Sequence, residues 1–143
     1  MRDAAAVIGR GGVSAVNIII DALTMVAIIY AGRKAVSRGQ AWPTTRVVNA
    51  MVATVVVLML AHFAEVVVWA LAYRIFDVTP EGTDRLYFAF VNYTTLGYGD
   101  VVPVERWRLI GPITALNGVL MIGWSTAVIF EVLRSAMRGP HSS

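Results

Sequence analysis

The chain has 143 residues, of which 57% are hydrophobic and 15% are charged, with a formal net charge of +3 and no cysteine. This hydrophobic content is too high for an ordinary soluble domain of that length. The small net charge argues against a nucleic-acid-binding protein, and the lack of cysteine excludes disulfides and thiolate metal sites. The composition therefore predicts an all-α membrane protein.

The N-terminal part, residues 1–46, is predicted to form an extra transmembrane helix and a basic connection. A Gly-rich lead-in at 1–12 precedes an apolar span at 13–31. This span is too long for the apolar region of a signal peptide, and no small-residue cleavage site follows it, so we expect it to cross the membrane. A polar connection at 32–45 follows, in which Pro43 marks the start of the next helix.

The second span is predicted at 47–73 and the third at 109–134, followed by a short cytoplasmic tail at 135–143. Between the two spans, a short apolar helix at 84–94 follows Thr83, which is a suitable N-cap. Its length is about half of what a bilayer requires, so this helix should be re-entrant. The predicted architecture is three transmembrane helices with one re-entrant helix and loop.

The basic residues predict the orientation. The connection between the first two spans carries four basic and no acidic residues, whereas the segment between the second and third spans carries four arginines and five acidic residues. Because cytoplasmic loops are enriched in lysine and arginine, the C-terminus is predicted to be cytoplasmic, with the N-terminus and the re-entrant loop outside. Eleven of the twelve basic residues are arginine, which favours a GC-rich bacterial genome and hence a bacterial inner membrane.

The run that follows the short helix is the most informative in the chain: Thr94-Thr95-Leu96-Gly97-Tyr98-Gly99-Asp100. Successive carbonyl groups can face one axis only if alternate residues adopt positive φ, which Gly97 and Gly99 permit at no steric cost. The Thr95 hydroxyl adds a further oxygen, and we expect the side chains of Leu96 and Tyr98 to pack against the short helix. The negative C-terminal end of that helix favours a cation below the loop. Because one loop cannot surround an ion, a closed ring of subunits is implied.

Residues 87–100, followed by Pro103 and a glycine-containing last span, resemble the pore module of potassium channels in order and spacing. The resemblance covers the outer helix, pore helix, filter and inner helix, at 47–134, and is greatest to small bacterial channels that lack a voltage sensor. Two positions depart from the family pattern. Leu96 replaces the commonest valine, and Val91 stands where some members place a glutamate, so a carboxyl clamp to Asp100 is absent.

The resemblance implies a homotetramer in a lipid bilayer that conducts K⁺ passively. It implies that five residues form the ion-binding filter: Thr95, Leu96, Gly97, Tyr98 and Gly99. The K⁺ ligands are expected at the first four of them. It also implies that a second group supports the filter: Thr94, Asp100, Tyr87 and Trp107. A non-selective cation channel and a non-conducting regulatory subunit remain as alternatives.

Several polar residues interrupt the apolar spans. His62, Glu65 and Trp69 fall three and four apart on one helical face. Ionisable residues within membrane spans are functional candidates, so His62 and Glu65 could be a proton-sensitive pair. We favour the interpretation that they form a buried hydrogen-bonded cluster that locks the outer helix to its neighbour. Asp21 and Asn17 in the first span are interpreted in the same way, as polar contacts to the pore module.

Gly118 and Gly123 in the last span suit either a hinge or close packing against the pore helix. No span carries arginine at every third residue, so no voltage-sensor helix is expected. No catalytic constellation occurs, so we predict that the protein is not an enzyme and needs no cofactor beyond the transported K⁺. The gating stimulus, which could involve an unidentified regulatory partner, is not predicted.

Overall fold

The computed structural model describes the backbone of residues 2–36 and 43–137, and the side chains of 12–30 and 43–135. The described elements are all helical: α1 (Arg2–Val36), α2 (Thr44–Ile75), α3 (Arg85–Tyr93), a 3₁₀ turn (Glu105–Trp107) and α4 (Ile110–Met137). Among the described residues, three stretches are long and apolar enough to cross a membrane: Gly12–Tyr30, Thr44–Ile75 and Glu105–Ser135. The predicted all-α fold with three spans is confirmed.

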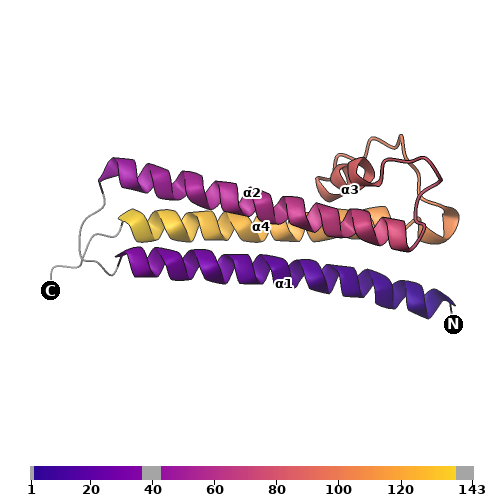
Figure 1. Ribbon diagram of the computed structural model, residues 1–143, viewed down its shortest axis with the longest axis horizontal. Coiled ribbons are helices and arrows are strands. Elements are labelled where there is room, and N and C mark those ends of the chain that lie inside the picture. Colours follow the sequence, from indigo (N-terminus) through magenta and orange to yellow (C-terminus); the bar gives the residue numbers. More distant parts are fainter. Residues whose placement is uncertain (1, 37–42, 138–143) are drawn as a thin grey trace.

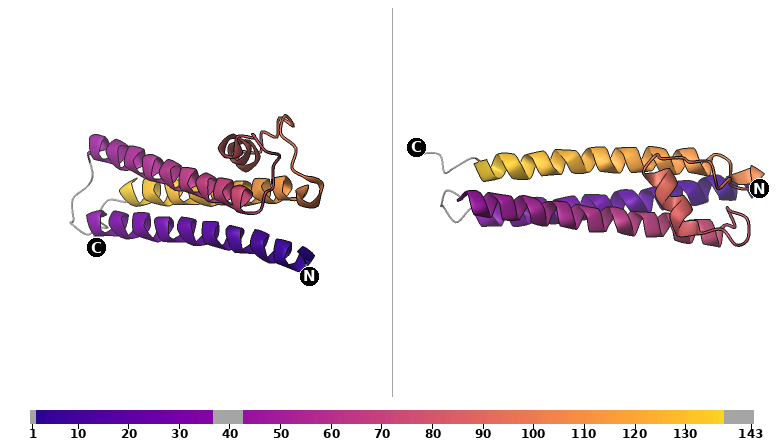
Figure 2. Two further views of the ribbon diagram at one scale, coloured as in Figure 1. Left: turned by 45° about the vertical axis from the view of Figure 1, so that its right-hand side comes forward. Right: turned by 90° about the horizontal axis from the view of Figure 1, so that it is seen from above.

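The helices α1, α2 and α4 run side by side as a bundle, and α3 lies against one end of α2 and α4 (Figures 1 and 2). The three long helices alternate in direction, so that the N-terminal end of α1 lies at the same end of the bundle as α3 (Figure 1). The end of α1, the start of α2 and the end of α4 lie at the opposite end. This arrangement agrees with the predicted common side for the N-terminus and the re-entrant loop.

The ends of the long helices differ from the predicted bounds. The lead-in expected at 1–12 is helical from Arg2, and α1 continues to Val36. Alanine, arginine and lysine in these stretches are good helix formers, which explains why the helix extends beyond the apolar span. Pro43 precedes the first turn of α2 with φ −61°, and its carbonyl accepts hydrogen bonds from the amides of Arg46 and Val47. The remainder of the predicted connection, 37–42, and the end of the tail, 138–143, lie outside the described residues.

The cap of α3 is Asp84, and the prediction of Thr83 was wrong. The Asp84 Oδ1 atom accepts hydrogen bonds from the amides of Leu86 and Tyr87, at 3.0 and 3.1 Å. Both residue types suit this position, and the charged carboxylate also interacts favourably with the positive end of the helix. With nine residues, α3 is far shorter than a membrane span.

An aromatic core holds α3 in place between α2 and α4. Tyr73 on α2 packs against Phe88 on α3 and against Trp69, with ring centroids 5.2 and 6.0 Å apart. The Tyr73 hydroxyl lies 2.6 Å from Thr114 Oγ1 on α4, and this oxygen in turn donates to the carbonyl of Ile110. Because buried polar groups need partners in an apolar environment, this chain of bonds also fixes the register of α2 against α4.

Candidate functional site

The run from Thr94 to Asp100 begins where α3 ends, and its backbone alternates in handedness. Gly97 and Gly99 have φ values of 54° and 77°, which confirms the expectation that both glycines adopt positive φ. Thr95 also has positive φ, 62°, which the sequence did not indicate because β-branched residues rarely adopt this conformation. Residues 95, 97 and 99 are therefore left-handed, while Leu96 and Tyr98 between them are not.

Hydrogen bonds join this run to the C-terminal turn of α3. The amide of Thr95 donates to the carbonyl of Asn92 at 2.9 Å, and the amide of Gly97 donates to the carbonyl of Val91 at 3.2 Å. These bonds satisfy carbonyl groups that a helix end otherwise leaves unpaired. Within the described chain, no backbone amide donates to the carbonyl oxygens of residues 95–98. The amides of Thr95 and Gly97 are therefore paired with α3, whereas the carbonyl oxygens of residues 95–98 accept no backbone hydrogen bond from the described residues.

At the C-terminal end of the run, the Tyr87 hydroxyl donates a hydrogen bond of 2.7 Å to Asp100 Oδ2. This hydrogen bond to a carboxylate raises the pKa of Tyr87. The contact agrees with the pairing predicted between Asp100 and Tyr87. Trp107, the other predicted neighbour, lies in the core against Phe76, with ring centroids 5.5 Å apart.

The prediction that Leu96 and Tyr98 pack against the short helix was wrong for the isolated chain. Their exposed fractions are 58% and 67%. The inner face of α3 is already covered by α2 and α4, which bury Phe88, Val91 and other side chains of that helix. The two residues thus present an uncovered surface beside the carbonyl run.

The two glycines of α4 have different surroundings. A Cβ atom on Gly118 would lie 2.0 Å from the carbonyl oxygen of Tyr93, whereas one on Gly123 would have nothing within 4 Å. Close packing against α3 therefore explains why position 118 requires glycine, and it does not explain the glycine at position 123. The hinge function stays a prediction for both.

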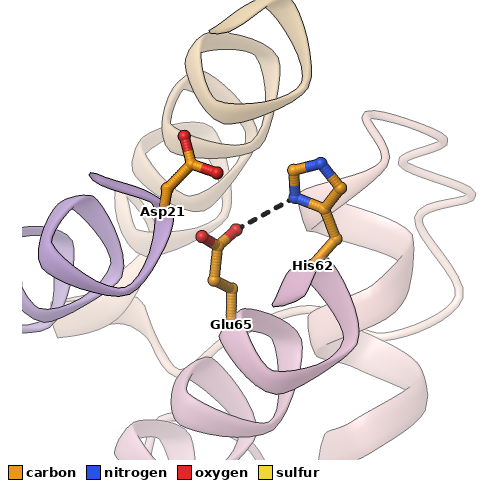
Figure 3. A group of neighbouring side chains, drawn as sticks. All are labelled: Asp21, His62 and Glu65. Carbon is orange, nitrogen blue, oxygen red and sulfur yellow. Dashed lines mark hydrogen bonds and ion pairs between the residues drawn. The ribbon is translucent and has the colours of Figure 1, made fainter. Parts of the chain in front are cut away.

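A buried polar cluster lies directly behind α3. Asp21 on α1 faces His62 and Glu65 on α2 (Figure 3). One carboxylate oxygen of each acid and one ring nitrogen of His62 lie within 4.8 Å of one another. His62 Nδ1 lies 3.2 Å from Glu65 Oε2, and the hydroxyl of Tyr93 on α3 donates to the same oxygen. On the opposite side of the ring, His62 Nε2 lies 3.0 Å from Ser125 Oγ on α4. The hydrogen bonds of the cluster thus join α2, α3 and α4, in agreement with the favoured interpretation of a locking cluster, and Asp21 brings α1 beside them.

Trp69 belongs to a neighbouring group of hydrogen bonds. Its indole nitrogen donates to Asn117 Oδ1 on α4 at 3.2 Å, and the Asn17 amide donates to the same oxygen at 3.1 Å. The predicted polar contact between the first span and the pore module is therefore present. Sequence reasoning missed Asn117, Ser125 and Tyr93. The spacing of Asn117 and Ser125, eight residues or about two helical turns apart in a charge-free span, was a usable signal.

The family model described as an ion channel matches residues 61–135 of the chain, which is more than half of its length. The matched segment contains the second half of α2, all of α3 with its loop, and nearly all of α4, whereas α1 lies outside it. No curated protein and no solved structure gives a significant match.

Proposed function

The chain belongs to this ion channel family, and from that membership we propose that it is a potassium-selective channel that conducts K⁺ passively across a bacterial inner membrane. The observation that carries the proposal is the alternating backbone of the run after α3, with positive φ at Thr95, Gly97 and Gly99. The proposed K⁺ ligands are the carbonyl oxygens of residues 95–98, together with the Thr95 hydroxyl.

The chemistry of this run suits a dehydrated cation. Potassium channels replace the hydration shell of the ion with rings of backbone carbonyl oxygens. Non-helical backbone at membrane depth is tolerated only where it is buried in protein or lines a water-filled path. The bonds from the amides of Thr95 and Gly97 to α3 hold the loop without using the carbonyl oxygens of residues 95–98. The C-terminal end of α3, with its partial negative charge, favours a cation nearby.

We propose that four copies surround the pore. A single loop presents oxygens from one side only, so a closed ring of identical subunits is needed to enclose an ion. The exposed side chains of Leu96 and Tyr98 support this proposal, because they lie beside the carbonyl run where neighbouring subunits would meet. By the distribution of basic residues, the end of the bundle that holds α3 faces outside and the C-terminus faces the cytoplasm.

The proposal is tested by reconstituting the purified protein in liposomes and measuring K⁺ and Na⁺ fluxes. We expect K⁺ flux that exceeds Na⁺ flux and that barium blocks. Tyr98→Asp should reduce this preference, whereas Val102→Asp adds the same charge at an exposed site just beyond the filter and should preserve it. Equal K⁺ and Na⁺ fluxes in the unsubstituted protein would favour a non-selective cation channel, and no flux would favour a regulatory subunit.

A further inference from the structure

The buried cluster of Asp21, His62 and Glu65 has no part in the proposed conduction of K⁺. We propose that these three residues bind a divalent transition-metal cation, with Zn²⁺ as the representative ion. The site lies between α1 and α2, where the carboxylate groups of Asp21 and Glu65 and the imidazole ring of His62 face a common space (Figure 3). It is separate from the filter, and its occupancy can be measured without ion flux.

The first argument is that two carboxylate oxygens lack partners. Asp21 is 2% exposed and Glu65 is fully buried, yet Asp21 Oδ2 and Glu65 Oε1 have no hydrogen-bond partner. Buried carboxylate oxygens are normally hydrogen-bonded or bound to a metal, because leaving them unpaired in an apolar environment is costly. The unpaired oxygens therefore point to a missing ligand in this space.

The second argument is that no fixed cation balances the two carboxylates. The spans at 13–31, 47–73 and 109–133 contain no lysine or arginine. The groups that face the cluster are His62 on α2, the Tyr93 hydroxyl on α3 and the Ser125 hydroxyl on α4. Of these, only His62 can carry a positive charge, so two ionised carboxylates would remain under-compensated. A bound divalent cation provides the required charge.

The donor set identifies the class of metal. One imidazole nitrogen and two carboxylates suit Zn²⁺ and similar transition metals, whereas Mg²⁺ and Ca²⁺ prefer sites built from oxygen alone. Ligands about 2.1 Å from a tetrahedral Zn²⁺ lie about 3.4 Å from one another. His62 Nδ1 and Glu65 Oε2 lie 3.2 Å apart, close to this spacing, so Glu65 would bind through Oε2, while its unpaired Oε1 marks the same space as lacking a partner. The nearest carboxylate oxygen of Asp21 lies within 4.8 Å of both atoms and would have to move closer to bind the same ion, and the Tyr93 hydroxyl or a water molecule can take the fourth position.

The surroundings of His62 also fit a metal ligand. Metal-bound histidines usually donate their second ring N–H to a nearby acceptor, which sets the tautomer and the ring orientation. Ser125 Oγ lies 3.0 Å from His62 Nε2 and can accept this hydrogen bond, which leaves the lone pair of Nδ1 facing Glu65 Oε2 and the Tyr93 hydroxyl. In the isolated chain the His62 side chain is 19% exposed.

A metal at this site would connect α1 to the filter. It would bind Asp21 on α1 and Glu65 on α2, and Glu65 also accepts the hydrogen bond from the Tyr93 hydroxyl. Tyr93 is the last residue of α3 and lies two positions before Thr95. The helix that lies outside the matched channel segment would thus be fastened to the element that supports the carbonyl run.

The experiment uses the full-length protein, purified in detergent with any affinity tag removed and stripped of metal by a chelator. Calorimetric titration with Zn²⁺ should show one saturable site per chain. Co²⁺ should give a visible d–d spectrum, without sulfur charge-transfer bands because the chain has no cysteine. Asp21→Asn and Glu65→Gln should each weaken Zn²⁺ binding by at least about 100-fold, and Ser125→Ala by about 10-fold.

Two matched controls address non-specific binding. Glu81→Gln removes an exposed carboxylate from the loop before α3, and His141→Gln removes the other histidine of the chain; both should bind Zn²⁺ as the unsubstituted protein does. No saturable Zn²⁺ or Co²⁺ binding by the correctly assembled, unsubstituted protein would overturn the proposal in favour of a proton shared by the carboxyl groups. Unchanged Zn²⁺ affinity in both Asp21→Asn and Glu65→Gln would also overturn the proposal. If a variant fails to assemble, the unsubstituted protein alone provides the test. One Zn²⁺ per chain together with a Co²⁺ d–d spectrum supports the proposal, and the absence of either overturns it.

Discussion

The contact between Gly118 and the end of α3 gives the sharpest prediction about stability. In Gly118→Ala, the new Cβ atom would lie 2.0 Å from the Tyr93 carbonyl oxygen and 2.9 Å from its carbonyl carbon. Because real Cβ contacts are essentially never shorter than 3.0 Å, α4 must move away from α3 by about 1 Å. The obstacle is backbone, so no side-chain rotation can relieve it.

The magnitude follows from two opposing effects. Overpacking of this kind destabilises a protein by about 1–3 kcal/mol, and a backbone obstacle favours the upper end of that range. Alanine in a helix interior is favoured over glycine by about 1 kcal/mol, which offsets part of the cost. We therefore expect Gly118→Ala to lower the free energy of unfolding by about 2 kcal/mol.

Gly123→Ala is the matched control, because its Cβ atom would meet nothing within 4 Å. It keeps the gain in helix propensity without the clash, so its stability should equal or exceed that of the unsubstituted protein. The assay is thermal or denaturant unfolding in one detergent, followed by tryptophan fluorescence, with K⁺ flux measured on the same samples. If Gly118→Ala is as stable as Gly123→Ala, close packing is not the reason for glycine at this position.

Two further predictions concern the hydrogen bonds beside the site. Tyr87→Phe removes the bond to Asp100 and should lower the free energy of unfolding at neutral pH. Because the pKa of Tyr87 is raised, this tyrosine stabilises the folded protein at pH values below its ordinary pKa of about 10. The stabilisation disappears as the pH rises through the higher pKa of the folded state, so the free energies of unfolding of the two proteins should converge there. A difference that persists at higher pH would contradict this. Asn117→Ala leaves two buried donors without their acceptor and should cost about 1–3 kcal/mol in unfolding experiments, whereas Thr126→Ala, on an exposed side of α4, should change stability by less than about 0.5 kcal/mol. Equal effects of these last two substitutions would refute the role of the shared acceptor.

The bundle could be predicted from the sequence because its main features are local. Long apolar runs predict spans through their length, and the apolar helix before the glycine-containing loop was too short to be a fourth span. Positive φ at Gly97 and Gly99 followed from the absence of a Cβ atom. The same reasoning could not find the positive φ of Thr95, because that conformation depends on the bonds from the loop to α3.

Local signals also left some choices undecided. Thr83 and Asp84 are both good N-caps, and the structure selects Asp84 through its bonds to the amides of Leu86 and Tyr87. For Gly118, the sequence suited both a hinge and close packing, and the structure shows the close packing, with the carbonyl of Tyr93 against it. In both cases, the sequence indicated the kind of residue needed, and the three-dimensional contact selected the position.

The sequence by itself determined the class of protein, the three spans, the half-length helix and the loop that follows it. These features depend on hydropathy, chain length and glycine, which act on a residue and its immediate neighbours. Only the tertiary structure decided that Asp21 reaches His62 and Glu65, and that Tyr93 joins them. The physical reason is that spans that are apolar on nearly every side have no single buried face, so their rotation in the bundle is set by inter-helix packing and a few buried hydrogen bonds.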